Sequence, residues 1–304
     1  MYTMVLKKKS ILFVVLAFIL LILGSYAYYK LKIRNKEISG FMQSSLLKEI
    51  SGIAASGIFE DIYYVHNDSG DTSRFFAITP KGKLVSTFYY KDDRSSAYPV
   101  LDCEDIAVGK GPKKDKSYVY LGDIGDNFKW RPYVTIYRFE EQSSWMKDSV
   151  NNIVPAQLRL TYPDWSKDSE AMMIDPIEEL LYIVNKRTDT VKIYTTPLSF
   201  KDQELRKLTL RGKIFIPGFK PFKYVTAGDI SKDGTRVLLK TYGKVYYWKR
   251  KGNEPIWQTM QEKPQELPYE LQRQGEAIGF TPDGKGYYTT SEAAFAAIYF
   301  YRLP

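Results

Sequence analysis

The sequence predicts an all-β fold, a single β-propeller, and two observations lead to this prediction. First, one pattern of strand, turn, aromatic strand and third strand recurs five times, at intervals of roughly 50 to 65 residues. Second, the strand-like segments alternate β-branched and aromatic residues and are separated by turn sequences such as Lys232-Asp233-Gly234 and Pro282-Asp283-Gly284. A four-stranded repeat of this length is typical of a propeller blade.

Each copy of the repeat is aligned on an apolar anchor in its first strand. The anchors are Ile53, Ile106, Met172, Ile230 and Ile278. The second strands are IYYVHN, YVYLGD, LYIVNK, RVLLKT and GYYTTS, the third strands are RFFAIT, VTIYRF, VKIYTT, KVYYWK and AIYFYR, and candidate fourth strands are KLVSTFYY, AQLRLTY, KLTLRGKIFI and PIWQTM. Five blades is the direct interpretation; the alternative is a sixth, degenerate blade between Asp175 and Thr226. Residues 41–48 are predicted to supply the outer strand that the last copy lacks.

Composition limits the possible functions. A chain of 304 residues with 44% hydrophobic residues can bury a core of domain size. One cysteine, Cys103, excludes an intrachain disulfide, and one histidine, His66, excludes sites that need two histidines, including the usual zinc hydrolase sets. The net charge is +9, but residues 1–36 hold seven Lys or Arg residues and no acid, which leaves about +2 for the remainder. The positive net charge therefore does not indicate a nucleic-acid partner.

Residues 10–29 form an almost unbroken apolar run behind three lysines, long enough to cross a bilayer as one transmembrane helix. We interpret residues 1–36 as a membrane anchor with a basic stalk, and residues 37–304 as the propeller domain. The alternative is a cleaved signal peptide, for which Ser25-Tyr26-Ala27 offers a small-residue cleavage pattern. Both interpretations predict a propeller on the extracytoplasmic side, and the first makes the membrane a partner through the N-terminal helix.

Paired motifs recur across residues 49–303: EISGI with HNDSG, CEDIA with GDIGDN, DSEAM with NK, AGDIS with LKTYG, and QGEAI with SE. In these motifs the chain resembles bacterial extracytoplasmic β-propellers of the phytase-like group, which look loosely related to gluconolactonase-type propellers. The resemblance implies the propeller fold and a location outside the cytoplasm. The known calcium-phytase motifs do not map cleanly onto this sequence, so the resemblance does not by itself imply phytase activity.

Acidic residues recur just before the anchors and at the ends of the second strands. Because the first strand of a blade lines the central channel, and the second strand ends at the same edge, these side chains should converge at one channel mouth. Crowded carboxylates repel each other unless a cation compensates, and hard cations prefer oxygen ligands. We therefore predict a Ca²⁺ or Mg²⁺ site, with no organic cofactor, formed by Glu104, Glu170, Glu276 and Asp123. The alternative is that the glutamates bind backbone groups of neighbouring blades, in which case they would lie apart.

Further polar residues are expected around the same mouth. The predicted ligand-binding residues are Glu49, Asp68, Lys186, Lys240 and Glu292, and the candidates for catalysis are His66, Asp126, Lys186, Lys240 and Tyr242. Two functions are consistent with this set. One is a membrane-anchored propeller that binds a ligand or an envelope protein at its acid-rich mouth. The other is a metal-assisted hydrolase of a phosphoester, an ester or a lactone.

Overall fold

The computed structural model describes residues 13–26, 36–91 and 101–304. The chain divides into a compact unit, Ile38–Pro304, and an N-terminal unit that ends at Glu37. In the N-terminal unit, residues 13–26 are helical, and the other residues of the predicted run 10–29 lie outside the described part of the chain. Among the residues that are described, no helix has both the length and the apolar character needed to cross a bilayer.

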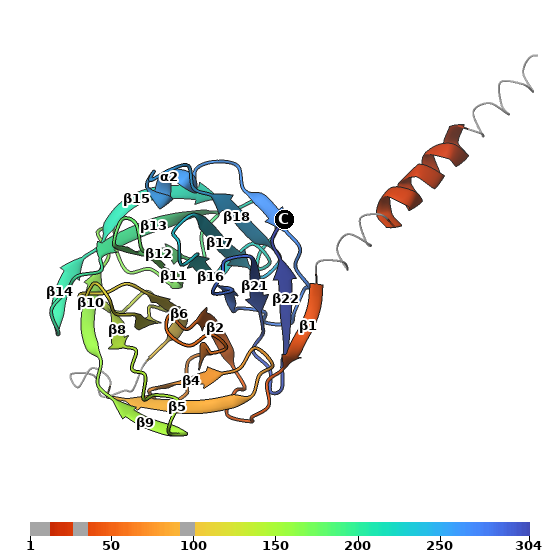
Figure 1. Cartoon of the computed structure of the whole chain (residues 1–304). Coiled ribbons are helices and arrows are strands. Elements are labelled where there is room, and N and C mark those ends of the chain that lie inside the picture. The colour runs from red at the N-terminus through yellow and green to blue at the C-terminus, as the bar shows by residue number, and fades with distance from the viewer. Residues whose placement is uncertain (1–12, 27–35, 92–100) are drawn as a thin grey trace, which may run out of the picture. The chain divides into compact units, whose positions relative to one another are not determined.

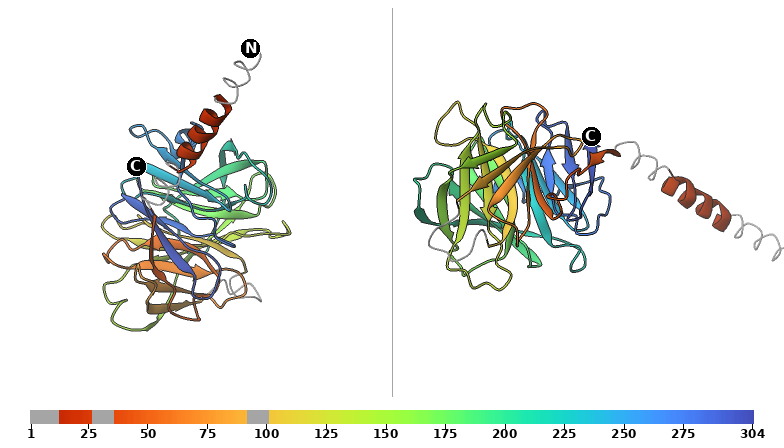
Figure 2. Two further views of the ribbon diagram at one scale, coloured as in Figure 1. Left: turned by 90° about the vertical axis from the view of Figure 1, so that its right-hand side faces the viewer. Right: turned by 90° about the horizontal axis from the view of Figure 1, so that it is seen from below.

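The Ile38–Pro304 unit is a five-bladed β-propeller, which confirms the predicted fold and the direct blade count (Figure 1). Its five sheets surround a central channel, and their first strands contact one another around it; two further views show the same sheets from other sides (Figure 2). The stretch from Asp175 to Thr226, considered above as a sixth blade, instead completes blade 3 and adds one strand to blade 2.

The strands of each blade are given from the channel outward. Blade 1 contains β2 (Ile50–Ala55), β3 (Tyr63–Asn67), β4 (Arg74–Ile78), β5 (Leu84–Tyr90) and β9 (Val150–Ile153). Blade 2 contains β6 (Cys103–Gly109), β7 (Tyr118–Asp123), β8 (Val134–Glu140), β10 (Ala156–Thr161) and β14 (Glu204–Lys207). Blade 3 contains β11 (Ser169–Asp175), β12 (Leu180–Asn185), β13 (Thr190–Pro197) and β15 (Thr209–Phe215). Blade 4 contains β16 (Val225–Ile230), β17 (Arg236–Thr241), β18 (Val245–Lys249) and β19 (Gln265–Leu267). Blade 5 contains β20 (Ile278–Phe280), β21 (Gly286–Thr289), β22 (Ala297–Arg302) and β1 (Lys36–Phe41).

Blade 5 is closed by β1, which comes from the start of the propeller and pairs with β22. The sequence predicted this kind of closure, but the predicted bounds, residues 41–48, were wrong. Residues after β1 form a turn, in which the backbone N–H of Leu47 donates to the carbonyl of Ser44 at 3.1 Å. Met42 and Leu47 are buried in the apolar cluster between blades 5 and 1, so they fill the core instead of extending a strand.

The prediction of PIWQTM as the fourth strand of blade 4 was also wrong. This segment contains the short helix α2 (Ile256–Thr259), and β19 takes the outer position in the sheet. Ile256 and Met260 are both buried, and their spacing of four residues places them on one face of a helical turn. The apolar residues of the segment therefore follow the helical period, not the strand alternation.

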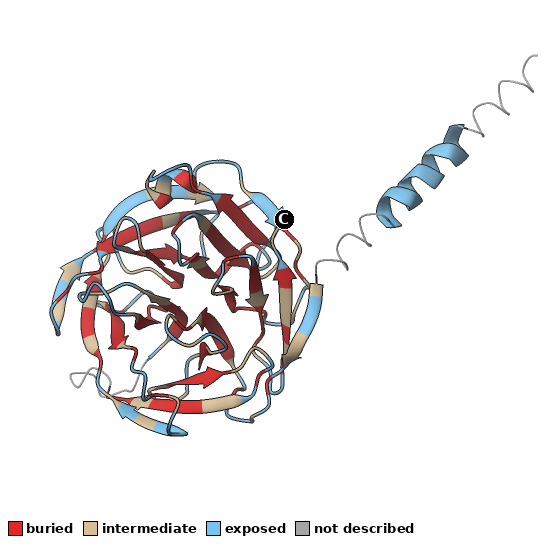
Figure 3. Ribbon diagram, in the orientation of Figure 1, coloured by how far each residue is buried: buried red, intermediate tan, exposed pale blue. Residues whose placement is uncertain are grey.

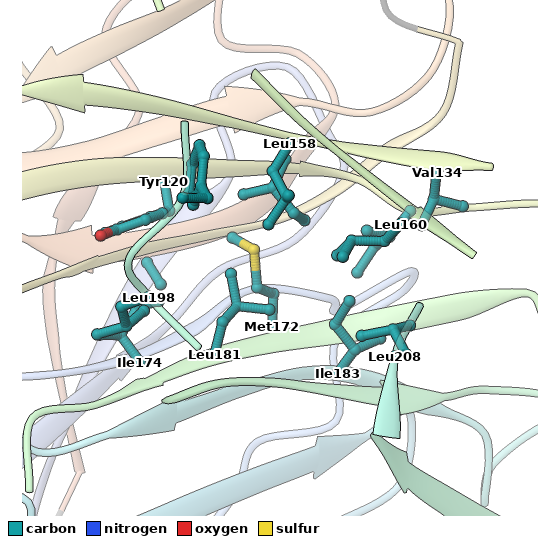
Figure 4. Close-up of a cluster of buried hydrophobic side chains, with 14 of the residues drawn as sticks. Tyr120, Val134, Leu158, Leu160, Met172, Ile174, Leu181, Ile183, Leu198 and Leu208 are labelled. Atoms are coloured by element: carbon teal, nitrogen blue, oxygen red, sulfur yellow. The ribbon is translucent and has the colours of Figure 1, made fainter. Parts of the chain in front are cut away.

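Five apolar clusters fill the spaces between neighbouring blades. In β11, Met172 and Ile174 belong to the cluster shared with blade 2 (Figure 4), whereas Ala171 and Met173 belong to the cluster shared with blade 4. A strand that is buried on both faces needs apolar residues at consecutive positions. Exposed residues are concentrated on outer strands such as β1, β9 and β15 (Figure 3).

Two aspartates, the buried Asp105 and the half-buried Asp229, connect the first strands around the channel. A first strand has a neighbour in its sheet on one edge only, so the backbone N–H groups on its other edge need acceptors. Asp105 Oδ2 accepts the N–H of Met172 in blade 3 at 2.8 Å and that of Gly228 in blade 4 at 3.2 Å. Asp229 Oδ2 accepts the N–H of Phe280 in blade 5 at 2.8 Å. Each carboxyl thus connects first strands of different blades.

Asp229 should make the stability of the propeller depend on pH. Burial raises the pKa of its carboxyl to about 7, above the ordinary value for aspartate. Because its pKa is raised, the Asp229 carboxyl binds a proton more tightly in the folded state than in the unfolded state. Its contribution to stability is therefore complete below about pH 4 and is lost as the pH rises through 7. Allowing for partial solvent contact, we expect a loss of about 1–3 kcal/mol from Asp229.

The test compares Asp229→Asn with the unchanged protein by urea unfolding at pH 5 and pH 8 in the presence of a chelator. The asparagine carbonyl can still accept the Phe280 N–H but does not ionise, so the variant should lose less stability over this range. Equal losses in the two proteins would contradict the assignment.

Candidate cation site at the channel mouth

A β-bulge at the start of the first strand sets the position of each mouth residue. In blades 1 to 4, the pairing of the first and second strands shifts register around one residue. The residues at the bulges are Ser51, Glu104, Glu170 and Thr226, and Glu276 is the corresponding residue of blade 5. A bulge changes the direction of the side chain that it carries. In blade 4 the residue is Thr226, which lies four residues before the anchor Ile230, whereas in the other blades the residue lies two before the anchor.

Glu104, Glu170 and Glu276 come together at the mouth. All three are buried, and one carboxylate oxygen of each lies within 4.8 Å of the others. Burial raises the pKa of Glu104 well above its usual value, and the charge of Glu170 raises it further. Burial also raises the pKa of Glu170, although Lys186 acts in the opposite direction. Glu104 and Glu170 therefore favour a proton on the carboxyl, or a cation beside it.

The partners of the three glutamates leave part of the cluster unsatisfied. Lys186 Nζ lies 2.5 Å from Glu170 Oε1. Tyr242 donates its hydroxyl to Glu276 Oε1, and the Ser51 hydroxyl lies 3.1 Å from Glu276 Oε2. Glu170 Oε2 is buried and has no hydrogen-bond partner among the described residues. Within the described chain, no backbone N–H donates to any of the three carboxyls, so the alternative in which they connect neighbouring blades through the backbone is not observed.

A second group of acids adjoins the first through Glu104. Ligand oxygens of Asp68, Asp102 and Glu104 also lie within 4.8 Å of one another. Burial, together with Asp68 and Asp168, raises the pKa of Asp102 to about 6. Glu292 lies beside Asp68 and Glu276, and burial and these neighbours raise its pKa to about 9.

Three predicted residues have other roles in the structure. Asp123 belongs to neither acidic group, because Arg131 Nη1 binds its Oδ1 at 2.7 Å. Asp126 accepts the backbone N–H groups of Trp130 and Arg131 at 3.0 and 3.1 Å, so it caps the loop after β7. Glu49 is only half-buried and lies 3.8 Å from Lys48.

Lys240 and His66 are enclosed next to the mouth. Lys240 Nζ donates to the carbonyls of Gly275 and Thr241, and burial lowers the pKa of its ammonium to about 7. His66 Nδ1 lies 2.9 Å from the carbonyl oxygen of Asn67, while its Nε2 is buried with no partner among the described residues. Burial lowers the pKa of His66 to about 4, so its imidazole is neutral at neutral pH.

Gly125 lies at the site, and the sequence indicated it only through the GDIGDN motif that contains it. A Cβ at this position would overlap Glu104 Oε1 and the Asp102 carboxyl. The GDIGDN motif therefore supplies a glycine where the backbone must pass close to two mouth acids. No side-chain pattern reveals such an approach, because it depends on how the β7–β8 loop folds over β6.

Comparison with known proteins adds no further assignment. No protein-family model matches the chain, and no curated protein matches it. The propeller part of the resemblance to the phytase-like group is confirmed by the fold, whereas the group itself rests on the motifs alone.

Proposed function

We propose that the protein is a ligand-binding propeller whose channel mouth holds a divalent cation between Glu104, Glu170 and Glu276. The observation that carries the proposal is the convergence of three buried carboxylates, with one oxygen, Glu170 Oε2, buried without a partner among the described residues. Lys186 compensates one negative charge in this group, and a cation would compensate the rest.

The type of ligand indicates a hard divalent cation, and the burial of the site favours Ca²⁺. One carboxylate oxygen from each glutamate lies within 4.8 Å of the others, close enough for the three to share one ion. Ca²⁺ accepts carboxylate oxygens at about 2.3–2.6 Å in flexible geometries, whereas Mg²⁺, at about 2.1 Å, demands nearly ideal octahedral geometry and usually keeps several waters. Three buried carboxylates from separate blades therefore suit Ca²⁺ better than Mg²⁺.

Cation binding should stabilise the native protein. At a Ca²⁺ concentration one hundred times Kd, the expected gain is about 2.7 kcal/mol, and a chelator should remove it. Glu104→Gln and Glu170→Gln should abolish most of this gain, because each removes a charged ligand oxygen. Thermal unfolding with Ca²⁺, with Mg²⁺ and with EDTA measures the effect.

Glu266→Gln is the matched control, because Glu266 forms a surface ion pair with Lys244. This variant should keep the full response to Ca²⁺. If the unchanged protein shows no cation-dependent shift, or if Glu170→Gln retains it, the cation site is refuted.

The second candidate function is metal-assisted hydrolysis, and the Asp68–Glu292 pair favours it. With a pKa of about 9, Glu292 keeps its proton at neutral pH, and burial also raises the pKa of the neighbouring Asp68. Paired carboxyls with raised pKa values can act as general acid and base. Cation-loaded protein incubated with p-nitrophenyl phosphate, p-nitrophenyl acetate and a simple lactone separates the two functions. Turnover favours the hydrolase, whereas a thermal shift without turnover favours the binding protein.

The same proposal places the propeller outside the cytoplasm, with residues 10–29 as its membrane anchor. Support comes from the apolar run behind three lysines and from the motifs shared with extracytoplasmic propellers. Protease treatment of spheroplasts tests this location, and protection of the propeller would count against it.

A further inference from the structure

Five aromatic side chains extend into solvent on the face of the propeller that contains the acid-rich mouth. Phe128 and Trp130 are 85% and 77% exposed, Trp165 is 90% exposed, and Phe219 and Phe222 are exposed as well. They belong to the connections β7–β8, β10–β11 and β15–β16. All three connections lie at the mouth end of the blades, because β7 ends there and β11 and β16 begin there. Exposed aromatic side chains gathered on one face indicate an interaction surface.

Hydrogen bonds and ion pairs join these connections into one surface across blades 2, 3 and 4. Arg187, after β12, donates to Asn127 in the first connection and to Asp168 at the end of the second. Asp189 forms an ion pair with Lys223 of the third connection at 2.8 Å. The aromatic side chains are therefore held on a common platform, which we call the aromatic rim (residues 127–130, 164–168, 187–192 and 219–223).

The aromatic rim is basic as well as aromatic. Its segments 127–130, 164–168, 187–192 and 219–223 carry six Lys or Arg residues and three Asp residues. Lys129 stands between Phe128 and Trp130, is exposed, and has no ion pair in the described part of the chain. Lys220 follows Phe219 and is also exposed, with its Nζ 3.6 Å from Asp189 in a surface ion pair. Aromatic and basic side chains thus alternate at the tips of two separate connections.

We propose that the aromatic rim docks on an anionic lipid bilayer. Aromatic side chains partition into the membrane interface, and lysines near the surface are attracted to anionic headgroups. The five aromatic tips come from three separate connections and are largely exposed, whereas an anchor residue of a protein partner is bound in a well-packed, desolvated pocket. A bilayer interface accepts such separated tips without shape complementarity. This inference does not depend on the cation site.

Tryptophan fluorescence of the full-length protein reconstituted into vesicles tests the proposal. All five tryptophans lie in the propeller, none lies in residues 1–36, and Trp130 and Trp165 are the two that extend from the rim. Brominated acyl chains quench tryptophan that enters the interface. We expect quenching in vesicles of brominated phosphatidylglycerol and loss of most of it in brominated phosphatidylcholine. Salt at 0.5 M should also remove most of the quenching, because it shortens the Debye length to about 4 Å from about 10 Å at 0.1 M.

Lys129→Glu/Lys220→Glu should abolish the quenching in anionic vesicles. Lys116→Glu/Lys285→Glu changes the net charge equally, but these exposed lysines lie in turns between first and second strands, at the other end of the blades. This control should be quenched like the unchanged protein. A thermal scan of each variant checks that it is folded.

Three results would overturn the proposal: no quenching in anionic vesicles, equal quenching in both lipids, or equal loss in the two double variants. The first would show that the rim does not enter the bilayer. A cation-dependent thermal shift in the same sample would still support the mouth site.

Discussion

Arg250→Met should destabilise the propeller by about 3–5 kcal/mol, because it leaves a buried carboxylate without its counter-ion. Arg250 and Asp175 are fully enclosed and bind each other through two parallel contacts, at 2.8 and 2.7 Å. The guanidinium also donates to the carbonyls of Gly234 and Glu254. Because Asp175 ends β11 and Arg250 follows β18, this pair fastens blade 3 to blade 4.

Urea unfolding measures the loss, and Arg236→Met provides the control. Arg236 faces Asp233 at 3.5 Å in a partly exposed ion pair, and such pairs contribute at most about 1 kcal/mol. Adding Asp175→Asn to Arg250→Met should restore part of the stability, since it removes the fully buried one of the two carboxylates that Arg250 binds; the other, Glu178, lies 3.2 Å from Nη2 and is partly exposed. Similar losses for Arg250→Met and Arg236→Met would show that the buried pair is not a main support of the interface.

The regular strands could be predicted from the sequence because their pattern is local. β7, β17 and β22 have the predicted bounds, and each is a run of alternating side chains between turn residues. The repeat also fixed which strands occupy equivalent positions, and this equivalence is enough to count five blades.

The outer edges could not be predicted in the same way. β9 and β14 pair in parallel with β5 and β10, strands of the preceding blade, and both are short and largely exposed. A strand at an exposed edge needs no apolar face, so it leaves no alternation to detect. β1 was misplaced for a related reason: the apolar residues that follow it, Met42 and Leu47, fill the core from a turn.

The mouth shows the same division between repeated and individual features. Glu104, Glu170 and Glu276 were expected together because they hold equivalent positions in the repeat, and the structure places them together. Asp123 was expected among them because β7 ends at the same edge, yet Arg131, eight residues later, binds it. Equivalence within a repeat predicts where a backbone position lies, whereas the partner of a side chain depends on loops that differ between blades.

Lys186→Met should strongly destabilise the protein, and the loss of stability should be smaller when a cation is bound. Lys186 is buried with Nζ 2.5 Å from Glu170 Oε1, and although burial opposes its charge, Glu170, Glu276 and Glu104 raise its pKa above the ordinary value. Without a cation, the variant leaves Glu170 uncompensated, and we expect a loss of about 3–5 kcal/mol. Removing the lysine also removes a positive charge that competes with a cation, so Ca²⁺ should bind roughly tenfold more tightly, equivalent to about 1.4 kcal/mol. Saturating Ca²⁺ should therefore restore much of the lost stability.

Lys240→Met is the control, because it also removes a buried lysine but one that does not bind the glutamates. Lys240 donates to backbone carbonyls and not to the glutamates, so its removal should reduce stability by a similar amount with and without Ca²⁺. The measurement is the difference in unfolding free energy between Ca²⁺ and EDTA for each variant. An increased difference for Lys186→Met alone is the expected result, because only that lysine shares a carboxylate with the proposed cation. An unchanged difference would mean that Lys186 and the cation do not compete for Glu170, and would remove the electrostatic basis of the site.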